Sequence, residues 1–73
     1  MNEIFIRDEF IRLDSALKFS GVIGTGGQAK MVIQDGLVLV NDEVCTMRGK
    51  KLYKNDVISV FDEEFEIEWK FLR

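Results

Sequence analysis

The chain has 73 residues and a formal net charge of −3, and its 47% hydrophobic and 32% charged residues are typical of a folded domain rather than of a disordered segment. It contains no histidine, the commonest general base, and its single cysteine cannot form an internal disulfide. No apolar run is long enough to span a membrane, and the start of the chain lacks the pattern of a signal peptide. We therefore expect a single cytoplasmic domain over residues 1–73 that is not an enzyme and holds no metal or cofactor.

Charge is distributed unevenly along the chain. Residues 18–54 contain six basic and three acidic side chains, whereas residues 55–73 contain two basic and six acidic ones. The local potential, rather than the net charge, decides where a polyanion binds. The sequence therefore predicts a molecule with one basic surface and one acidic surface.

Two short helices are predicted in the first half of the chain. Apolar residues recur with helical spacing from Leu13 onward, and Gly21 is suited to end this first helix. Thr25 is a favourable N-cap for a second helix, which should end at Gly36. The helical side chains expected to pack into the core are Leu13, Ala16, Leu17, Ala29, Val32 and Ile33.

Strands are predicted at residues 4–6, 37–40, 44–47, 57–60 and 65–71. Asn41-Asp42 suits a tight hairpin turn, residues 48–51 should form a loop, and residues 62–64 should form a further turn. The last strand alternates apolar with charged residues and is expected to pair with the first. The aromatic side chains expected in the core are Phe5, Phe10, Phe19, Phe65, Trp69 and Phe71. The predicted fold is therefore α+β, with two short packed helices against a small, mostly antiparallel sheet.

A glycine-rich turn, Gly24-Thr25-Gly26-Gly27, precedes the second helix. A helix N-terminus exposes unpaired amide groups and the positive end of the helix dipole, which together suit an anion such as phosphate. Lys30 lies on the same helical face and leans toward that end, so its ammonium group could reach the same anion. The turn is similar to two known kinds of loop. Unlike a dinucleotide-binding loop, it is not preceded by a strand, and unlike a nucleotide-binding P-loop, it has no Lys-Ser/Thr pair. A phosphate cradle and a bare connecting turn are both open interpretations.

A basic cluster follows the predicted hairpin, since Arg48, Lys50, Lys51 and Lys54 lie within seven residues. Tyr53 lies among them as a candidate stacking partner. Charge runs are commonly solvated loops, and that interpretation also stays open. Four positive charges set in an acidic protein nevertheless favour a surface for an anionic partner.

The order of these motifs resembles the S4-like RNA-binding domain, also called the alpha-L motif. The resemblance covers about residues 11–60 and rests on Ile11 to Asp14, Ala29-Lys30, Ile33 to Gly36, Val38 to Asp42 and Lys54 to Ile58. The segments from Thr25 to Lys30 and from Arg48 to Leu52 are most similar to the small stand-alone YaaA-like subgroup.

This resemblance implies a protein that binds structured ribosomal or transfer RNA through the two helices and the basic cluster, in association with ribosomal particles. The sequence does not define the oligomeric state, and we expect a monomer. Phosphate contacts would position the RNA, and its shape would select it. The RNA-binding residues that it implies are Gly26, Gly27, Gln28, Lys30, Arg48, Lys50 and Lys51, to which the basic cluster adds Lys54. The rival interpretation is a protein-interaction adapter that works through the acidic C-terminal hairpin.

Overall fold

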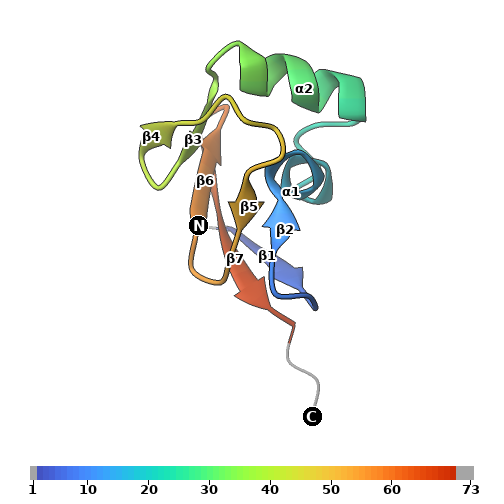
Figure 1. The fold of residues 1–73 in the computed structure, drawn as a ribbon, viewed down its shortest axis with the longest axis vertical. Coiled ribbons are helices and arrows are strands. Elements are labelled where there is room, and N and C mark those ends of the chain that lie inside the picture. The colour runs from blue at the N-terminus through green and yellow to red at the C-terminus, as the bar shows by residue number, and fades with distance from the viewer. Residues whose placement is uncertain (1, 71–73) are drawn as a thin grey trace.

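The computed structural model describes residues 2–70, whose arrangement is shown in Figure 1. In chain order the elements are β1 (Asn2–Ile6), β2 (Ile11–Arg12), α1 (Leu13–Phe19), α2 (Gly26–Gln34), β3 (Val38–Val40), β4 (Glu43–Val44), β5 (Lys51–Leu52), β6 (Val57–Val60) and β7 (Glu63–Trp69). The predicted α+β class and both predicted helices are confirmed. No helix in residues 2–70 is long and apolar enough to cross a membrane.

One five-stranded sheet has the order β1-β7-β6-β3-β4. Its strand pairs are antiparallel except β1 and β7, which run parallel. The predicted pairing of the last strand with the first is therefore confirmed. The strands β2 and β5 form a separate antiparallel ribbon. In Figure 1, α2 lies across the upper end of the sheet and α1 lies next to β2.

The helices cover one face of the five-stranded sheet. Alternate strand residues face them, and all six helical side chains predicted for the core are buried. No helix of residues 2–70 covers the opposite side of the sheet: Leu39, Ser59 and Glu64 are neighbours in register there, and they are half-exposed or exposed. We refer to this side as the open face. The buried core consists of Ile4, Ile6, Leu13, Ala16, Leu17, Ile23, Ala29, Val32, Ile33, Val38, Val40, Leu52, Ile58, Val60, Phe65 and Ile67.

The predicted helix ends are also confirmed. Thr25 is the N-cap of α2, with extended backbone angles and a side chain that accepts a hydrogen bond. Gly21 and Gly36, which follow the two helices, have φ of 82° and 75°. This left-handed conformation is readily available to glycine and is the common way to end a helix.

The predicted return strand at residues 44–47 is wrong in its bounds, because β4 spans Glu43–Val44. Asn41 and Asp42 have φ of 51° and 71°, as in a two-residue hairpin turn of type I′. Pairing therefore resumes directly at Glu43, opposite Val40. Beyond Val44 the chain leaves the sheet and continues toward α1.

Two further turn predictions need correction. Residues 48–51 are not all loop, since Lys51 pairs with Arg12 in the β2–β5 ribbon; strands of two residues are too short to show a period in the sequence. The turn predicted at residues 62–64 is instead Phe61-Asp62, with φ of 51° and 64°, and β7 already begins at Glu63. The glutamates at its start are exposed strand residues rather than turn residues.

The prediction that the aromatic side chains fill the core is largely wrong. Phe65 is buried and Phe10 is half-buried, but Phe5, Phe19 and Trp69 are exposed. Phe5 lies between two buried residues of β1 and so points to the open face. Phe71 lies outside the described residues.

Candidate nucleic-acid interface

The N-terminus of α2 is fixed by a reciprocal pair of hydrogen bonds. The hydroxyl of Thr25 accepts a hydrogen bond from the backbone amide of Gln28 at 3.1 Å. The side-chain oxygen of Gln28 in turn accepts one from the backbone amide of Gly24 at 3.2 Å. This is a variant of the capping box, and its Thr-x-x-Gln signature is visible in the sequence but was not used in the prediction. Gln28, a predicted RNA-binding residue, therefore also has a structural role.

Gly26 and Gly27 are the first residues of α2, and the fold gives no reason for glycine at either position. Neither has a positive φ, and a Cβ atom added at either would meet nothing within 4 Å. Glycine at such positions costs helix stability relative to alanine. Within residues 2–70 their amide groups have no hydrogen-bond partner. The bare start of α2 therefore presents free donors that another molecule can approach closely.

Lys30 is exposed one turn further along α2. It follows Gly26 by four residues and Gly27 by three, so all three lie on one side of the helix. A lysine side chain on a helix leans toward the N-terminus, so the ammonium group is within reach of the first turn of α2.

The loop of residues 48–51, called here the basic loop, is attached to the start of α1 by its backbone. The amide of Leu13 donates to the carbonyl of Lys50 at 2.8 Å, and the amide of Asp14 donates to the carbonyl of Arg48 at 3.1 Å. The N-cap residue Arg12 makes no side-chain capping bond, so these two carbonyls replace the usual cap. Because the backbone makes the attachment, the long basic side chains stay exposed.

The β2–β5 ribbon extends this surface with two residues that the sequence prediction did not include, Arg12 and Phe10. Arg12 is the register partner of Lys51, and its guanidinium lies 3.7 Å from where a Cβ on Gly49 would be. The Lys51 ammonium lies 4.8 Å from the centre of the Phe10 ring, a cation–π contact. The rings of Phe10 and Tyr53 are 6.1 Å apart and tilted by 48°. The ribbon therefore presents two cations and two aromatic rings on one side.

The sequence pattern that turns Arg12 outward beside Lys51 is recognisable only once the structure is known. Ile11 and Leu52 are apolar and paired, which turns their neighbours Arg12 and Lys51 outward together. Each strand has two residues, so neither gives a pattern that could be recognised from the sequence.

Lys54, in contrast, has an acidic partner on the five-stranded sheet. Its ammonium lies 3.6 Å from a carboxylate oxygen of Glu68 on β7. The pair is partly exposed, so its contribution to stability is small. Arg12 also has an acidic neighbour, since its guanidinium lies 3.2 Å from the carboxylate of Asp14.

In the part of the chain that the structure describes, every polar and charged side chain is at least partly exposed. One group of carboxylates, Glu3, Glu66 and Glu68, has oxygens within 4.8 Å of one another on the open face. These residues are exposed or half-exposed, and acidic groups of this kind are common without a bound ion.

Comparison with known proteins defines the class of this domain. The sequence model of the S4 domain family matches residues 4–68, which include every described helix and nearly all of the sheet. The chain therefore belongs to the S4 domain family of RNA-binding domains. A protein of Bacillus subtilis (strain 168), named "Probable ribosome maturation protein RlbA", is 46% identical to it over 59 residues, which make up 81% of this chain and 83% of that protein.

Proposed function

We propose that this chain is a non-enzymatic RNA-binding protein of the cytoplasm that acts in ribosome maturation, with residues 1–73 working as one S4-like domain. Membership of the S4 domain family supports the RNA-binding role. The name of the Bacillus subtilis relative supports the connection with ribosome maturation. Structured ribosomal or transfer RNA is the proposed ligand.

The observation that carries the proposal is the attachment of the basic loop to α1. It holds Arg48, Lys50 and Lys51 close to Arg12 through backbone bonds, so the basic side chains are gathered without being used for the attachment. A concentrated group of exposed cations attracts phosphates even though the whole chain is acidic.

The start of α2 forms the second part of the proposed interface. There Gly26, Gly27 and Lys30 offer two free amide groups and an ammonium group to a phosphate. The helices α1 and α2 pack against each other, so the two parts belong to one layer of the molecule. Phosphates held by both parts would fix an RNA by its shape rather than its base sequence. In this proposal Lys54 contributes least, because Glu68 already pairs with it.

Salt dependence tests the proposal. Binding to a structured ribosomal RNA fragment or to transfer RNA, followed by fluorescence anisotropy, should give a log–log slope against salt concentration of roughly −2 to −4, since each phosphate contact releases somewhat less than one counterion. The double substitution Lys50→Glu and Lys51→Glu should weaken binding and flatten that slope together.

A matched control distinguishes the contribution of the basic loop to RNA binding from the effect of net charge alone. Arg7→Glu with Lys70→Glu changes the net charge by the same amount at exposed positions outside the proposed interface. We expect this control to weaken binding far less, because Arg7 and Lys70 belong neither to the basic loop nor to the start of α2. Equal losses in the two variants, or no salt-sensitive binding at all, would refute the proposed interface.

A further inference from the structure

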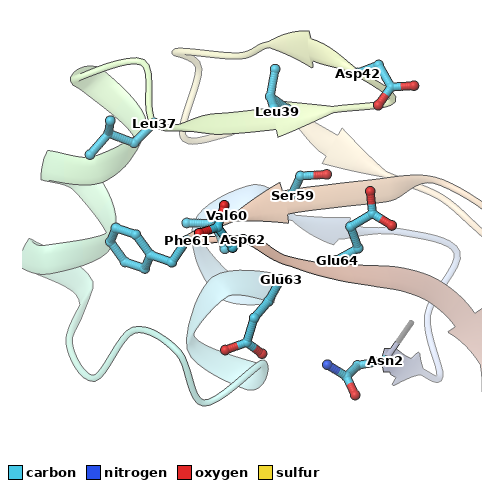
Figure 2. Close-up of a pocket in the computed structure, with 10 residues that line it drawn as sticks. All are labelled: Asn2, Leu37, Leu39, Asp42, Ser59, Val60, Phe61, Asp62, Glu63 and Glu64. Atoms are coloured by element: carbon cyan, nitrogen blue, oxygen red, sulfur yellow. The ribbon is translucent and has the colours of Figure 1, made fainter.

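A second surface lies away from the proposed RNA interface, around the turn between β6 and β7. It is a groove with a volume of about 800 Å³, and it combines apolar and acidic side chains. Figure 2 shows Leu37 and the Phe61 ring toward one end of it, with Glu64, Asn2 and Asp42 toward the other. We refer to it as the acidic groove. Its lining residues are Asn2, Leu37, Leu39, Asp42, Ser59, Val60, Phe61, Asp62, Glu63 and Glu64.

The apolar part of the acidic groove is unusually exposed. Leu37 has 50% and Phe61 has 52% of its surface in contact with solvent, and both project from turns rather than from the covered side of the sheet. Adjacent exposed apolar side chains with a polar rim are a common feature of protein interaction sites. The large aromatic ring is the kind of side chain that dominates the energy of an interface.

The backbone at Phe61 adds an independent observation. Its φ is 51°, and Asp62 follows with φ of 64°, so both central residues of this hairpin turn are left-handed. Asparagine or glycine is favoured at such positions, whereas a bulky aromatic residue is an outlier there. In the other hairpin turn, residues 41 and 42 are asparagine and aspartate, which fit the same geometry well. The chain thus keeps Phe61 exposed in a strained conformation, with nothing in residues 2–70 that covers it.

The rim of the acidic groove decides what can bind there. Four carboxylates line it, Asp42, Asp62, Glu63 and Glu64, and within residues 2–70 none of its lining residues is basic. The open face beside it adds Glu3, Glu66 and Glu68, of which only Glu68 has a basic partner in the described part of the chain. Such a surface repels nucleic acid and attracts positive charge.

We propose that the acidic groove is a docking site for a basic peptide segment of a partner protein, in which an apolar residue packs against Phe61 and Leu37 while Arg or Lys side chains pair with the acidic rim. Charge complementarity selects the cationic segment, and the exposed ring provides its anchor. The proposal is independent of the proposed RNA-binding function, because it uses residues of the other surface.

The test uses a short synthetic peptide in which Arg and Leu alternate, added to the isotopically labelled protein and followed by NMR. We expect shifts of the backbone signals of Leu37, Leu39 and the Phe61-Asp62 turn. A peptide with Glu in place of every Arg should not bind, and one with Ser in place of every Leu should bind about tenfold more weakly. If the Arg–Leu peptide shifts no signals of the acidic groove at low salt, the proposal is wrong.

The variant Phe61→Asn separates binding from folding. Asparagine tolerates the left-handed backbone, so the variant should unfold at a higher urea concentration than the natural chain. It removes the ring, so peptide affinity should fall about tenfold.

The matched control is Phe19→Ser, since Phe19 is a phenylalanine on α1 with 68% of its surface exposed. The peptide affinity of this control should be unchanged. Peptide binding that survives Phe61→Asn, or concentration-dependent self-association of the chain that this variant abolishes, would overturn the proposal.

Discussion

At the scale of single residues, the glycines of this chain fall into two kinds. Gly36 has a φ of 75°, a conformation that other residues adopt only with strain. Gly26 and Gly27 have no such requirement, and no neighbouring atom limits the size of a side chain there. Their presence at the start of α2 lowers helix stability with no gain inside the fold. Glycines that lower the stability of a helix are expected where an external ligand needs close access to the backbone.

Replacing Gly27 with alanine should therefore have opposite effects on stability and on binding. The free energy of unfolding should rise by about 0.5 to 1 kcal/mol, because alanine is the better helix former and the space around it is open. Affinity for structured RNA should fall severalfold, since the new methyl group keeps phosphate away from the free amides. Urea denaturation and RNA titration of the same preparation measure both quantities.

Gly36→Ala is the control for this experiment. It places a Cβ in the left-handed conformation and should lower stability by about 1 kcal/mol, while RNA affinity of the folded protein stays the same. If Gly27→Ala left RNA affinity unchanged, the glycines would return to the interpretation as a bare connecting turn.

At the scale of elements, the two helices begin in different ways. The first amides of α1 are bound by carbonyls of the basic loop, whereas α2 is capped by Thr25 and leaves two amides free. The first helix is thus closed by the chain itself, and the second stays open to solvent. This difference assigns the two parts of the proposed interface distinct roles, with side-chain charge at α1 and backbone donors at α2.

Hydrogen exchange should reveal this difference directly. The amides of Leu13 and Asp14 should exchange slowly for first-turn helical residues, because each donates to the basic loop. The amides of Gly26 and Gly27 should exchange at nearly the rate of an unstructured peptide, and Gln28 should be protected by Thr25. Two-dimensional NMR in deuterated water resolves these positions. Rapid exchange at Leu13 would show that the basic loop is not attached to α1 in solution.

The sequence predicted the elements with a clear period and missed those without one. Both helices were recognisable from apolar spacing and caps such as Thr25. The β2–β5 ribbon was not, because pairing of Arg12 with Lys51 depends on a tertiary contact between two very short segments. The turn at Phe61 was misplaced because an aromatic residue gives no signal for a left-handed backbone. For the candidate site, the basic residues were visible in the sequence, but their proximity to Arg12 and Phe10 was not.

At the scale of the whole molecule, charge is separated between two layers. The basic loop is attached to the helical layer, whereas the acidic groove lies at the edge of the open face of the sheet. The acidic groove shares no lining residue with the proposed RNA interface, and charge interactions are screened over about 8 Å at physiological salt. An RNA and a basic peptide would therefore occupy the two surfaces without strong mutual influence under those conditions.

The effect of bound RNA on the peptide affinity of the acidic groove should consequently depend on the salt concentration. At physiological ionic strength, saturating RNA should change the peptide affinity of the acidic groove by less than about twofold. At an ionic strength of about 0.01 M the screening length grows to about 30 Å, which is comparable to the dimensions of the molecule, and bound RNA should then tighten peptide binding by long-range attraction. NMR signals of the Phe61-Asp62 turn report occupancy of the groove, and the Phe61→Asn variant measures any peptide that binds the RNA directly. Displacement of the peptide by RNA at physiological salt would mean that the two ligands compete for one surface. The inference that RNA and peptide bind to separate surfaces would then be wrong.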